Sequence, residues 1–328
     1  MWGREGVRGW VGGCTNHEVL LPHTGLRIAL VGSINRDTIR TPDGMTTESY
    51  GGLLYSILSL AALTDGGVEV FPVCNVGQDA QAAVAGFLSR SPLVQGDGVR
   101  FVPDRNNHCF LDYDAEGRKQ ETLQGGVPPL TFERLSPFLA CDALCFNFIT
   151  GFELSAETLE RVRASTHALI LMDVHSLTLG IDEQRRRFWR RPPDWERWVA
   201  CARVVQMNER EASLLWGADV TRGDEMRQFG ERVLGLGPSI LIVTRGALGS
   251  DALFRGPDGG IESFHAAAAP PGPPVDETGC GDVFLMGFTV EYLRSRDVRR
   301  ASVFANRAAG ANCCLRGVEE IGRIREYV

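Results

Sequence analysis

Short apolar runs alternate with longer amphipathic stretches along the chain from residue 26 onward. The runs are rich in β-branched residues and end in polar or glycine-containing turns, which is typical of buried strands, while the stretches between them have helical spacing. The predicted strands are Arg27–Gly32, Val68–Cys74, Ala143–Phe148, Ala168–Met172, Arg203–Met207, Ile240–Thr244 and Ser250–Phe254. The predicted helices are Leu53–Leu63, Ala80–Ser89, Ala156–Ser165, Ala212–Trp216, Arg300–Leu315 and Glu319–Tyr327. This alternation predicts an α/β fold with a mostly parallel, doubly wound sheet.

One segment departs from the alternation. Three short strand patterns follow one another without a helix between them, and Ala115–Arg118 supplies a hairpin turn. These patterns cover Val99–Pro103, His108–Tyr113 and Arg118–Leu123. A small antiparallel sheet inserted in an α/β chain suggests a lid. We expect one domain over residues 26–328, with lid segments at about 38–50 and 99–124.

Residues 1–25 are rich in glycine with scattered arginines, and they lack the apolar centre of a signal peptide. We expect a disordered N-terminal extension, or a start codon assigned too early. The nine cysteines are odd in number and include no C-x-x-C pair, which favours reduced thiols. No apolar run approaches the length of a membrane span. We therefore expect a cytoplasmic protein that does not interact with a membrane.

The charge distribution argues against a nucleic-acid partner. The formal net charge is −7, so the chain lacks the basic surface that binds phosphate backbones. The arginines of Arg185–Arg187, with Arg190 and Arg191, lie among acidic residues and predict a solvated helical face.

The single lysine of the chain excludes several nucleotide and cofactor chemistries. Lys119 lies in a turn-like segment, whereas a P-loop needs lysine after glycine at a helix start, protein kinases need one on a strand, and pyridoxal enzymes need one as a Schiff base. The sequence also contains no H-E-x-x-H, G-x-S-x-G or G-x-G-x-x-G. The sequence therefore does not favour a zincin, an α/β-hydrolase or a dinucleotide-binding protein.

The strongest chemical signal is the stretch Val275–Asp282, which leads into an apolar-periodic helix that begins at or just before Asp282. Gly279 and Gly281 allow a tight turn and close approach of backbone N–H groups to a ligand. Unpaired N–H groups at a helix start attract anions. A carboxylate at such a place is a candidate general base, and the alternative is that Asp282 only caps the helix.

Other polar groups follow predicted strands at the edge where open α/β sheets bind ligands. Asp37, in the segment Gly32–Asp37, is either a ligand for vicinal hydroxyls or a turn residue. Asn208 and Glu211 have the spacing of a capping box, and the same carboxylate could order water around Mg²⁺. His175 follows another strand, and a lone histidine in a loop is more often structural or solvated than a ligand contact.

Taken together, these motifs resemble the ribokinase (PfkB) carbohydrate-kinase family over the chain from about Leu26 to its end. The order of the matching motifs carries the resemblance: Gly32–Asp37, Gly51-Gly52, Asn208-x-x-Glu211, Val243–Gly246 with Gly249, and Asp276–Asp282. The resemblance implies a three-layer αβα sandwich with a β lid, and an ATP- and Mg²⁺-dependent kinase of a hydroxyl group on a small sugar, sugar phosphate or nucleoside.

The resemblance also implies roles for individual residues. Asp282 would deprotonate the acceptor hydroxyl, and Gly279, Cys280 and Gly281 would form the anion hole. The implied acceptor-binding residues are Asn35, Asp37, Gly51, Gly52 and Ser56. The implied nucleotide-binding residues are Asn208, Thr244, Gly246, Gly249 and Asn306, with Glu211 near the metal through water.

Three departures from the family pattern limit the inference. Ser56 replaces an asparagine that contacts sugar in the family, and the segment from Asp37 to Gly51 is short. A homodimer is possible, but the short segment weakens the case for one formed through the lid. Cys280 stands where alanine is commoner. These departures keep open a non-catalytic relative that senses a sugar or nucleotide, whereas an oxidoreductase is disfavoured because the glycine loop follows the last extended segment rather than the first strand.

Overall fold

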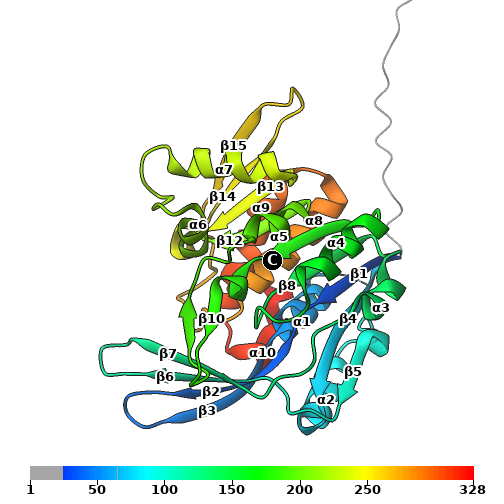
Figure 1. Cartoon of the computed structure of the whole chain (residues 1–328), viewed down its shortest axis with the longest axis vertical. Helices are drawn as coiled ribbons and strands as arrows, with labels where there is room; N and C mark the ends of the chain where they lie inside the picture. Colours follow the sequence, from blue (N-terminus) through cyan, green and yellow to red (C-terminus); the bar gives the residue numbers. More distant parts are fainter. Residues whose placement is uncertain (1–24, 65) are drawn as a thin grey trace, which may run out of the picture.

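The computed structural model describes residues 25–64 and 66–328, so the predicted extension over residues 1–25 lies almost entirely outside the described residues. Its central element is a sheet of nine strands in the order β15-β14-β13-β12-β9-β8-β1-β4-β5 (Figure 1). The strands are β1 (Leu26–Val31), β4 (Val68–Gly77), β5 (Val99–Val102), β8 (Ala143–Asn147), β9 (Leu169–Asp173), β12 (Val204–Asn208), β13 (Ile240–Thr244), β14 (Ser250–Arg255) and β15 (Ile261–Ala266). Neighbours from β5 to β13 pair in parallel, and β14 and β15 are antiparallel at one edge. The predicted mostly parallel sheet is confirmed.

Helices cover both faces of this sheet, because side chains that alternate along each strand enter two separate apolar cores. In β1, Ile28 and Leu30 enter one core and Ala29 and Val31 the other. The first core is covered by α1 (Leu53–Leu63), α2 (Gln81–Leu88), α8 (Cys280–Ser295) and α9 (Val298–Cys313). The second is covered by α3 (Phe132–Leu135), α4 (Ala156–Ser165), α5 (Trp195–Ala200), α6 (Glu209–Trp216) and α7 (Glu225–Leu236). No helix within residues 25–64 and 66–328 is long and apolar enough to cross a membrane.

The strand order reverses direction between β1 and β8. From β1 the chain adds β4 and β5 on one side, and then adds β8, β9, β12 and β13 on the other. At such a switch point the loops that leave the carboxyl ends of neighbouring strands diverge and open a crevice. The two strand ends approach closely here, since a Cβ atom on Gly32 would lie 2.8 Å from the backbone oxygen of Asn147.

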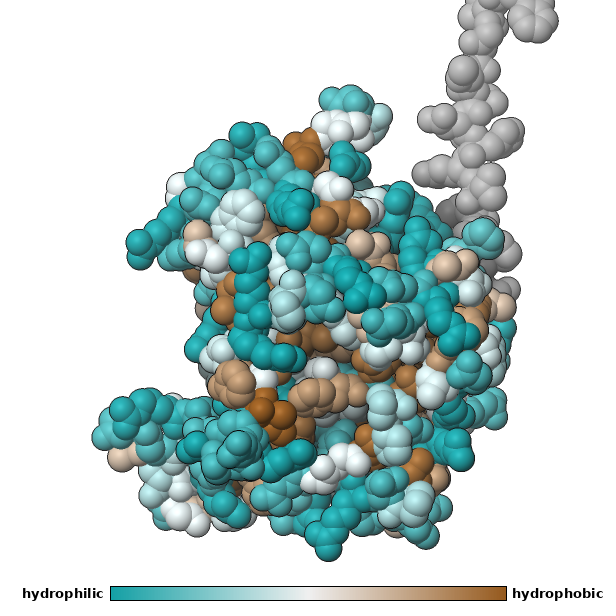
Figure 2. Space-filling model, in the orientation of Figure 1, coloured by the Kyte–Doolittle hydropathy of each residue, from teal (hydrophilic) through white to brown (hydrophobic). Residues whose placement is uncertain are grey.

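A second sheet of four strands lies over this crevice as a lid, with the order β3-β2-β6-β7. Its strands are β2 (Ile34–Arg40), β3 (Thr46–Gly52), β6 (His108–Tyr113) and β7 (Lys119–Gln124). The surface is hollowed between this lid and the main sheet (Figure 2). The predicted small second sheet is confirmed, although its strands differ from those expected.

The lid begins earlier than expected and omits one predicted strand. The segment Ile34–Arg40 is a strand of the lid and not a loop, because it pairs with β3 on one side and β6 on the other. The pattern at Val99–Val102 forms β5 in the main sheet, where it pairs with the unexpectedly long β4. Sequence periodicity identifies a strand but does not specify the sheet that it joins.

Several elements were missed or misassigned. The structure adds α5, α7 and β15, and the last predicted helix is a short α10 (Gly317–Glu320) followed by 3₁₀ turns over Ile321–Glu326. The predicted helical face at the arginine run is wrong. That segment forms a hairpin of β10 (Leu179–Ile181) and β11 (Arg187–Trp189), and Arg187 is buried. Pairing with the lid explains the difference, since the Leu123 N–H donates to the Arg185 carbonyl.

The packing of α8 into the first core gives a stability prediction. Phe288 is completely buried between the sheet and the neighbouring helices. We expect Phe288→Ala to lower the free energy of unfolding by about 3–5 kcal/mol, because it removes buried area and leaves a cavity. Urea denaturation measures this, with the exposed Tyr327→Ala as control, for which a change within about 0.5 kcal/mol is expected. Equal losses in both variants would contradict the packing described.

Candidate active site

The start of α8 presents unpaired backbone donors beside a carboxylate. Gly279 precedes the helix with a φ of 75°, and a Cβ atom there would collide with the ring of Tyr55. Only glycine satisfies both the left-handed conformation and the close packing. Within the described residues, the N–H groups of Gly281 and Asp282 donate to no backbone carbonyl. The helix start thus has the geometry of an anion-binding site.

The carboxylate of Asp282 is held from the side by the switch-point strand β8. The Nδ2 atom of Asn147 donates to Asp282 Oδ1 at 2.6 Å and to Ser56 Oγ at 2.9 Å. Burial raises the pKa of Asp282 to about 6, although the charge of His175 and the bond from Asn147 both act to lower this pKa. Asn147 therefore links Asp282 to Ser56 at the start of α1, and it keeps the carboxylate in one orientation.

A second acidic cluster lies at the ends of β9 and β12. Asn208 and Glu211 form a capping box at the start of α6: the backbone N–H and Nδ2 of Asn208 donate to the two carboxylate oxygens of Glu211, at 2.9 and 2.6 Å. The predicted capping box is confirmed. His175 Nδ1 lies 3.8 Å from Glu211 Oε1, and His175 has a φ of 33°, a conformation unusual for residues other than glycine.

The ionisable groups of the two clusters influence one another. Burial raises the pKa of Asp173 well above its usual value; the charge of His175 opposes this shift, and the charges of Glu211 and Asp282 add to it. Burial lowers the pKa of His175. The opposite effect of three carboxylates is larger and raises this pKa to about 9; they are Glu211, Asp173 and Asp282. His175 is therefore a cation at neutral pH and offsets part of the surrounding negative charge.

The glycine loop after β13 lies beside this acidic cluster. Thr244 is the register partner of Asn208 in the β12–β13 pair, so the loop of Gly246 and Gly249 begins next to the capping box. Asn306 is placed differently. Its Nδ2 donates to Ser250 Oγ and to the Ser302 carbonyl, both at 2.9 Å, and it holds α9 against the start of β14. Asn306 therefore lies next to the end of the loop, but the hydrogen bonds of its side-chain amide join α9 to β14.

The lid contributes Asn35 and Asp37 from β2. Asn35 is the register partner of Gly51, and a Cβ atom on Gly51 would lie 2.5 Å from Asp37 Oδ2. Burial raises the pKa of Asp37 to about 7, with a further increase from Glu121 and an opposing effect of Lys119. Asn35 Oδ1 is buried without a partner, and Asp37 accepts no hydrogen bond from any residue that the structure describes. Both groups are free to bind a ligand.

The acidic groups fit a metal ion that is held largely by water and by the ligand. No cluster of three or more histidine, cysteine, aspartate or glutamate side chains within residues 25–64 and 66–328 is arranged to hold a metal directly. Glu211 already accepts two hydrogen bonds from Asn208. Mg²⁺ keeps several waters and takes one or two carboxylates with phosphate oxygens, so Glu211 and Asp173 suit such an ion without a protein cage.

Sequence reasoning missed three residues of this site: Asn147, Asp173 and Gln206. All three are buried polar residues on otherwise apolar strands, and Gln206 Nε2 donates to the Gly281 carbonyl at 2.9 Å. A buried polar side chain near the carboxyl end of a strand is a signal that could have identified them.

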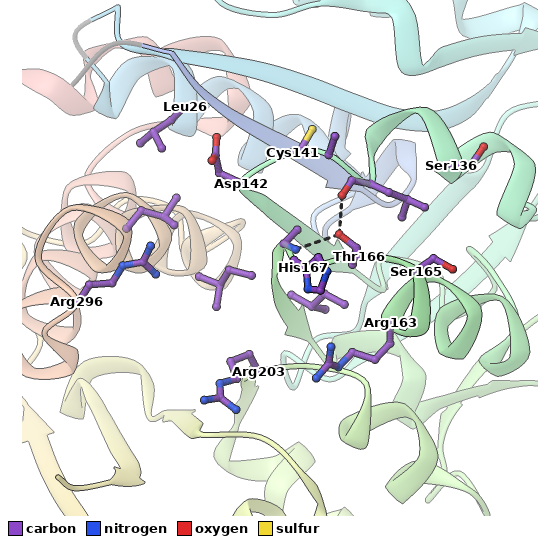
Figure 3. Close-up of a pocket in the computed structure, with 16 residues that line it drawn as sticks. Leu26, Ser136, Cys141, Asp142, Arg163, Ser165, Thr166, His167, Arg203 and Arg296 are labelled. Carbon is purple, nitrogen blue, oxygen red and sulfur yellow. Dashed lines mark hydrogen bonds between the residues drawn. The ribbon is translucent and has the colours of Figure 1, made fainter. Parts of the chain in front are cut away.

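A large cavity lies elsewhere in the molecule. It has a volume of about 900 Å³ and lies near the amino ends of β1, β9 and β12 (Figure 3). Arg163, Arg203 and Arg296 line it. None of the predicted site residues lines this cavity, so it is separate from the crevice at the switch point.

Comparison with known proteins identifies relatives of this chain in sequence and in fold. A sequence model described as pfkB family carbohydrate kinase matches residues 163–321. Ribokinase of Bacillus subtilis is 34% identical over 307 residues, which cover 89% of this chain and 94% of that protein. Cytidine kinase of Thermococcus kodakarensis is 26% identical over 272 residues, which cover 83% and 90%. The structure of Arabidopsis thaliana ribokinase complexed with ribose and ATP superposes with a TM-score of 0.71 and 16% identity, over 93% of this chain and 100% of that chain. The predicted ribokinase-like fold is confirmed.

The raised pKa of Asp282 gives a second stability prediction. A carboxyl whose folded pKa of about 6 exceeds its unfolded pKa of 3.8 destabilises the fold progressively as the pH rises from about 4 to 6. Asparagine keeps the shape and can still accept from Asn147. We expect Asp282→Asn to melt at a higher temperature than the parent at pH 8, with the difference shrinking toward pH 4. A lower melting temperature at pH 8 would contradict the buried position of this charge.

Proposed function

Because the chain belongs to the PfkB family of carbohydrate kinases, which are phosphotransferases that act on hydroxyl groups, we propose that it transfers the γ-phosphoryl group of ATP to a small hydroxylated acceptor. The acceptor class comprises sugars, sugar phosphates and nucleosides. The curated relatives named ribokinase and cytidine kinase support this range. The kinase uses Mg²⁺ and takes Asp282 as its general base.

One observation carries the proposal: an oriented carboxylate lies beside free backbone donors at a helix start. Asn147 fixes the carboxylate of Asp282, and the neighbouring N–H groups of Gly281 and Asp282 donate to no backbone carbonyl in the described chain. An anion that binds these donors is held beside a group that can accept a proton. Phosphoryl transfer needs this combination, because its transition state depends on positioning and on fixed donors.

In the proposed reaction, Asp282 accepts the proton of the acceptor hydroxyl as its oxygen forms a bond to the γ-phosphorus. The bond from phosphorus to the β–γ bridging oxygen breaks, and ADP leaves with that oxygen. The turn of Gly279, Cys280 and Gly281 forms the anion hole. Its N–H donors for the equatorial oxygens are those of Gly281 and Asp282, whereas the N–H of Cys280 donates to the Glu277 carbonyl in the absence of a ligand. The bond from Asn147 keeps the carboxylate directed at the hydroxyl and favours its ionised form.

On the donor side, Asn208, Thr244, Gly246 and Gly249 surround the phosphates and nucleotide, with Asn306 behind the loop. Mg²⁺, when bound with the nucleotide, neutralises phosphate charge. Glu211 orders water around the metal, and the adjacent Asp173 adds a second carboxylate to this region. His175 limits the accumulation of negative charge in the absence of substrate.

On the acceptor side, Asn35 and Asp37 bind hydroxyl groups from the lid while Gly51, Gly52 and Ser56 shape the floor. Asp37 has no hydrogen-bond partner within the described residues, so its oxygens can accept from a vicinal diol. Ser56 replaces the larger asparagine of the family and its hydroxyl already accepts from Asn147. A sensing relative without catalysis would have no need for an oriented Asp282, which favours the kinase.

The first test is the loss of phosphoryl transfer on changing the proposed base. We expect Asp282→Asn to lower kcat by about 10²–10⁴-fold with the best acceptor, since the acceptor hydroxyl then loses its proton acceptor. ADP release in a coupled assay measures the rate, with the exposed Asp258→Asn as a control that should keep the parental rate. An unimpaired Asp282→Asn enzyme would remove the basis of the mechanism and favour the sensing relative.

The pH dependence gives an independent test. Asp37 and Asp282 must both be ionised in the proposed mechanism, and their pKa values are about 7 and about 6. We therefore expect kcat/KM to fall below pH 7 and more steeply below pH 6, because each protonation removes a required charge. In Asp37→Asn the decline should begin only near pH 6. A profile flat from pH 8 to 5 would show that neither carboxylate acts as proposed.

A further inference from the structure

Arg187 is a buried arginine whose hydrogen-bonding capacity is largely unused. Its side chain is 2% exposed. One guanidinium nitrogen, Nη2, donates to the Thr150 carbonyl at 2.8 Å, whereas Nε and Nη1 are buried without any partner. Unpaired donors on a buried cation are costly, so such a group is seldom retained unless something binds it.

The charges nearest to Arg187 lie on the lid strand β7. Glu121 Oε1 is 3.8 Å from Arg187 Nε, too far for a hydrogen bond, and Glu121 Oε2 is 3.4 Å from the amine of Lys119. Lys119 is the only lysine in the chain. Two cations from different elements therefore share one carboxylate beneath the lid.

These residues lie on the side of the lid that carries Asp37. Asp37 is the register partner of Cys109 in β6, and Cys109 is the partner of Leu123 in β7. Glu121 is two residues before Leu123, so it projects from the same face of the sheet. Thr150 follows Ile149, whose side chain borders Gly52. Arg187 thus contacts Thr150 beside the proposed acceptor floor and lies near Glu121 of the lid.

We call the charged residues on this side of the lid the wall, and their charges balance without a ligand. Asp37, Glu121 and Glu153 carry three negative charges when ionised, and Lys119, Arg187 and Arg190 carry three positive charges. Asp37 needs O–H or N–H donors, and Arg187 needs oxygen lone pairs. A polyhydroxylated ligand offers both and adds no net charge. A phosphate monoester would add about two negative charges to a wall where Glu121 already raises the pKa of Asp37.

A cavity of about 260 Å³ adjoins the wall, and the two charged side chains that line it, Glu153 and Arg185, are opposite in sign. Thr150, Leu123, Glu153, Arg185 and Asn75 line it. The carboxylate of Glu153 accepts from Thr150 and Gly151, and the guanidinium of Arg185 donates to the carbonyls of Leu123 and Gly125. Among the buried side-chain atoms of this lining that the structure describes, the neutral Oδ1 of Asn75 lacks a hydrogen-bond partner.

We propose that Arg187 is a specificity-determining residue of the acceptor site, and that with Glu121 and Lys119 it forms a balanced wall that selects an uncharged polyhydroxylated acceptor over a sugar phosphate. The inference rests on the proposed kinase function and narrows its acceptor class. Free sugars, cyclitols and nucleosides share the chemistry that fits this wall, and a panel assay distinguishes them.

The parent enzyme is tested first with ribose, fructose, myo-inositol and cytidine against ribose 5-phosphate, fructose 6-phosphate and fructose 1-phosphate. ADP release gives kcat/KM, and a thermal shift in the presence of a non-hydrolysable ATP analogue reports binding without turnover. We expect at least one uncharged acceptor to exceed every phosphorylated compound by tenfold or more. The proposal is overturned if a sugar phosphate is the best acceptor, or if no uncharged compound binds.

Two variants test the role of the wall. Glu121→Gln leaves Lys119 and Arg187 with one excess positive charge, and we expect the ratio of kcat/KM for phosphorylated over uncharged acceptors to rise about tenfold. Arg187→Gln should raise KM for the uncharged acceptor about tenfold while kcat stays within about threefold. The matched control is Arg186→Gln, because the side chain of Arg186 is 53% exposed. This control should change neither the ratio of kcat/KM values nor the KM for the uncharged acceptor. An unchanged ratio in Glu121→Gln would contradict selection by charge.

Failure of this inference can be separated from failure of the proposed function. If the parent enzyme prefers a sugar phosphate and Asp282→Asn abolishes that activity, the kinase mechanism stands and only the role of the wall is wrong. If Asp282→Asn retains full activity with the preferred acceptor, the mechanism itself is wrong. Arg187→Lys adds a check on folding, because it keeps the charge and should recover much of the lost acceptor affinity.

Discussion

The hydrogen bond from Asn147 to Asp282 is the contact on which the rest of the site depends. It joins the end of β8, at the switch point of the sheet, to the start of α8. The same amide reaches Ser56 in α1. One side chain thereby holds the carboxylate, the helix with the free N–H groups and the helix beneath the lid in a fixed relation. A displaced α8 would separate the acid from the donors that must act with it.

The two ends of the crevice have different electrostatic characters. At the end proposed to bind the donor, the charges of Asp173, Glu211 and Asp282 raise the pKa of His175 against the effect of its burial. The pKa of Asp173 is raised chiefly by burial, and the charges of Glu211 and Asp282 add to this shift. A nucleotide that enters with a divalent ion brings the positive charge that this end lacks. At the end proposed to bind the acceptor, the charged groups that act on Asp37 and Arg187 balance in sign, so this end needs no counter-ion.

The sequence contained enough information for the helix at Leu53–Leu63, whose observed bounds match those expected from an apolar run that follows a glycine pair. It also located the start of α8 to within two residues, because the glycine turn and the apolar periodicity agree there. It was insufficient where pairing partners decide the structure. The lid strand at Ile34–Arg40 has polar residues on both faces, and its conformation depends on β3 and β6.

The arginine run shows the same limit most clearly. Charge density alone favours a solvated face, and Arg185, Arg186 and Arg187 have identical side chains in one tripeptide. Strand geometry places alternate residues on opposite faces, so Arg187 can be buried beneath the lid while Arg186 stays in solvent with Asp182. The difference between the exposed side chain of Arg186 and the buried side chain of Arg187 is therefore a matter of register. This register is set by pairing with β10 and by a bridge to β7, and the local sequence of the arginine run does not specify either contact.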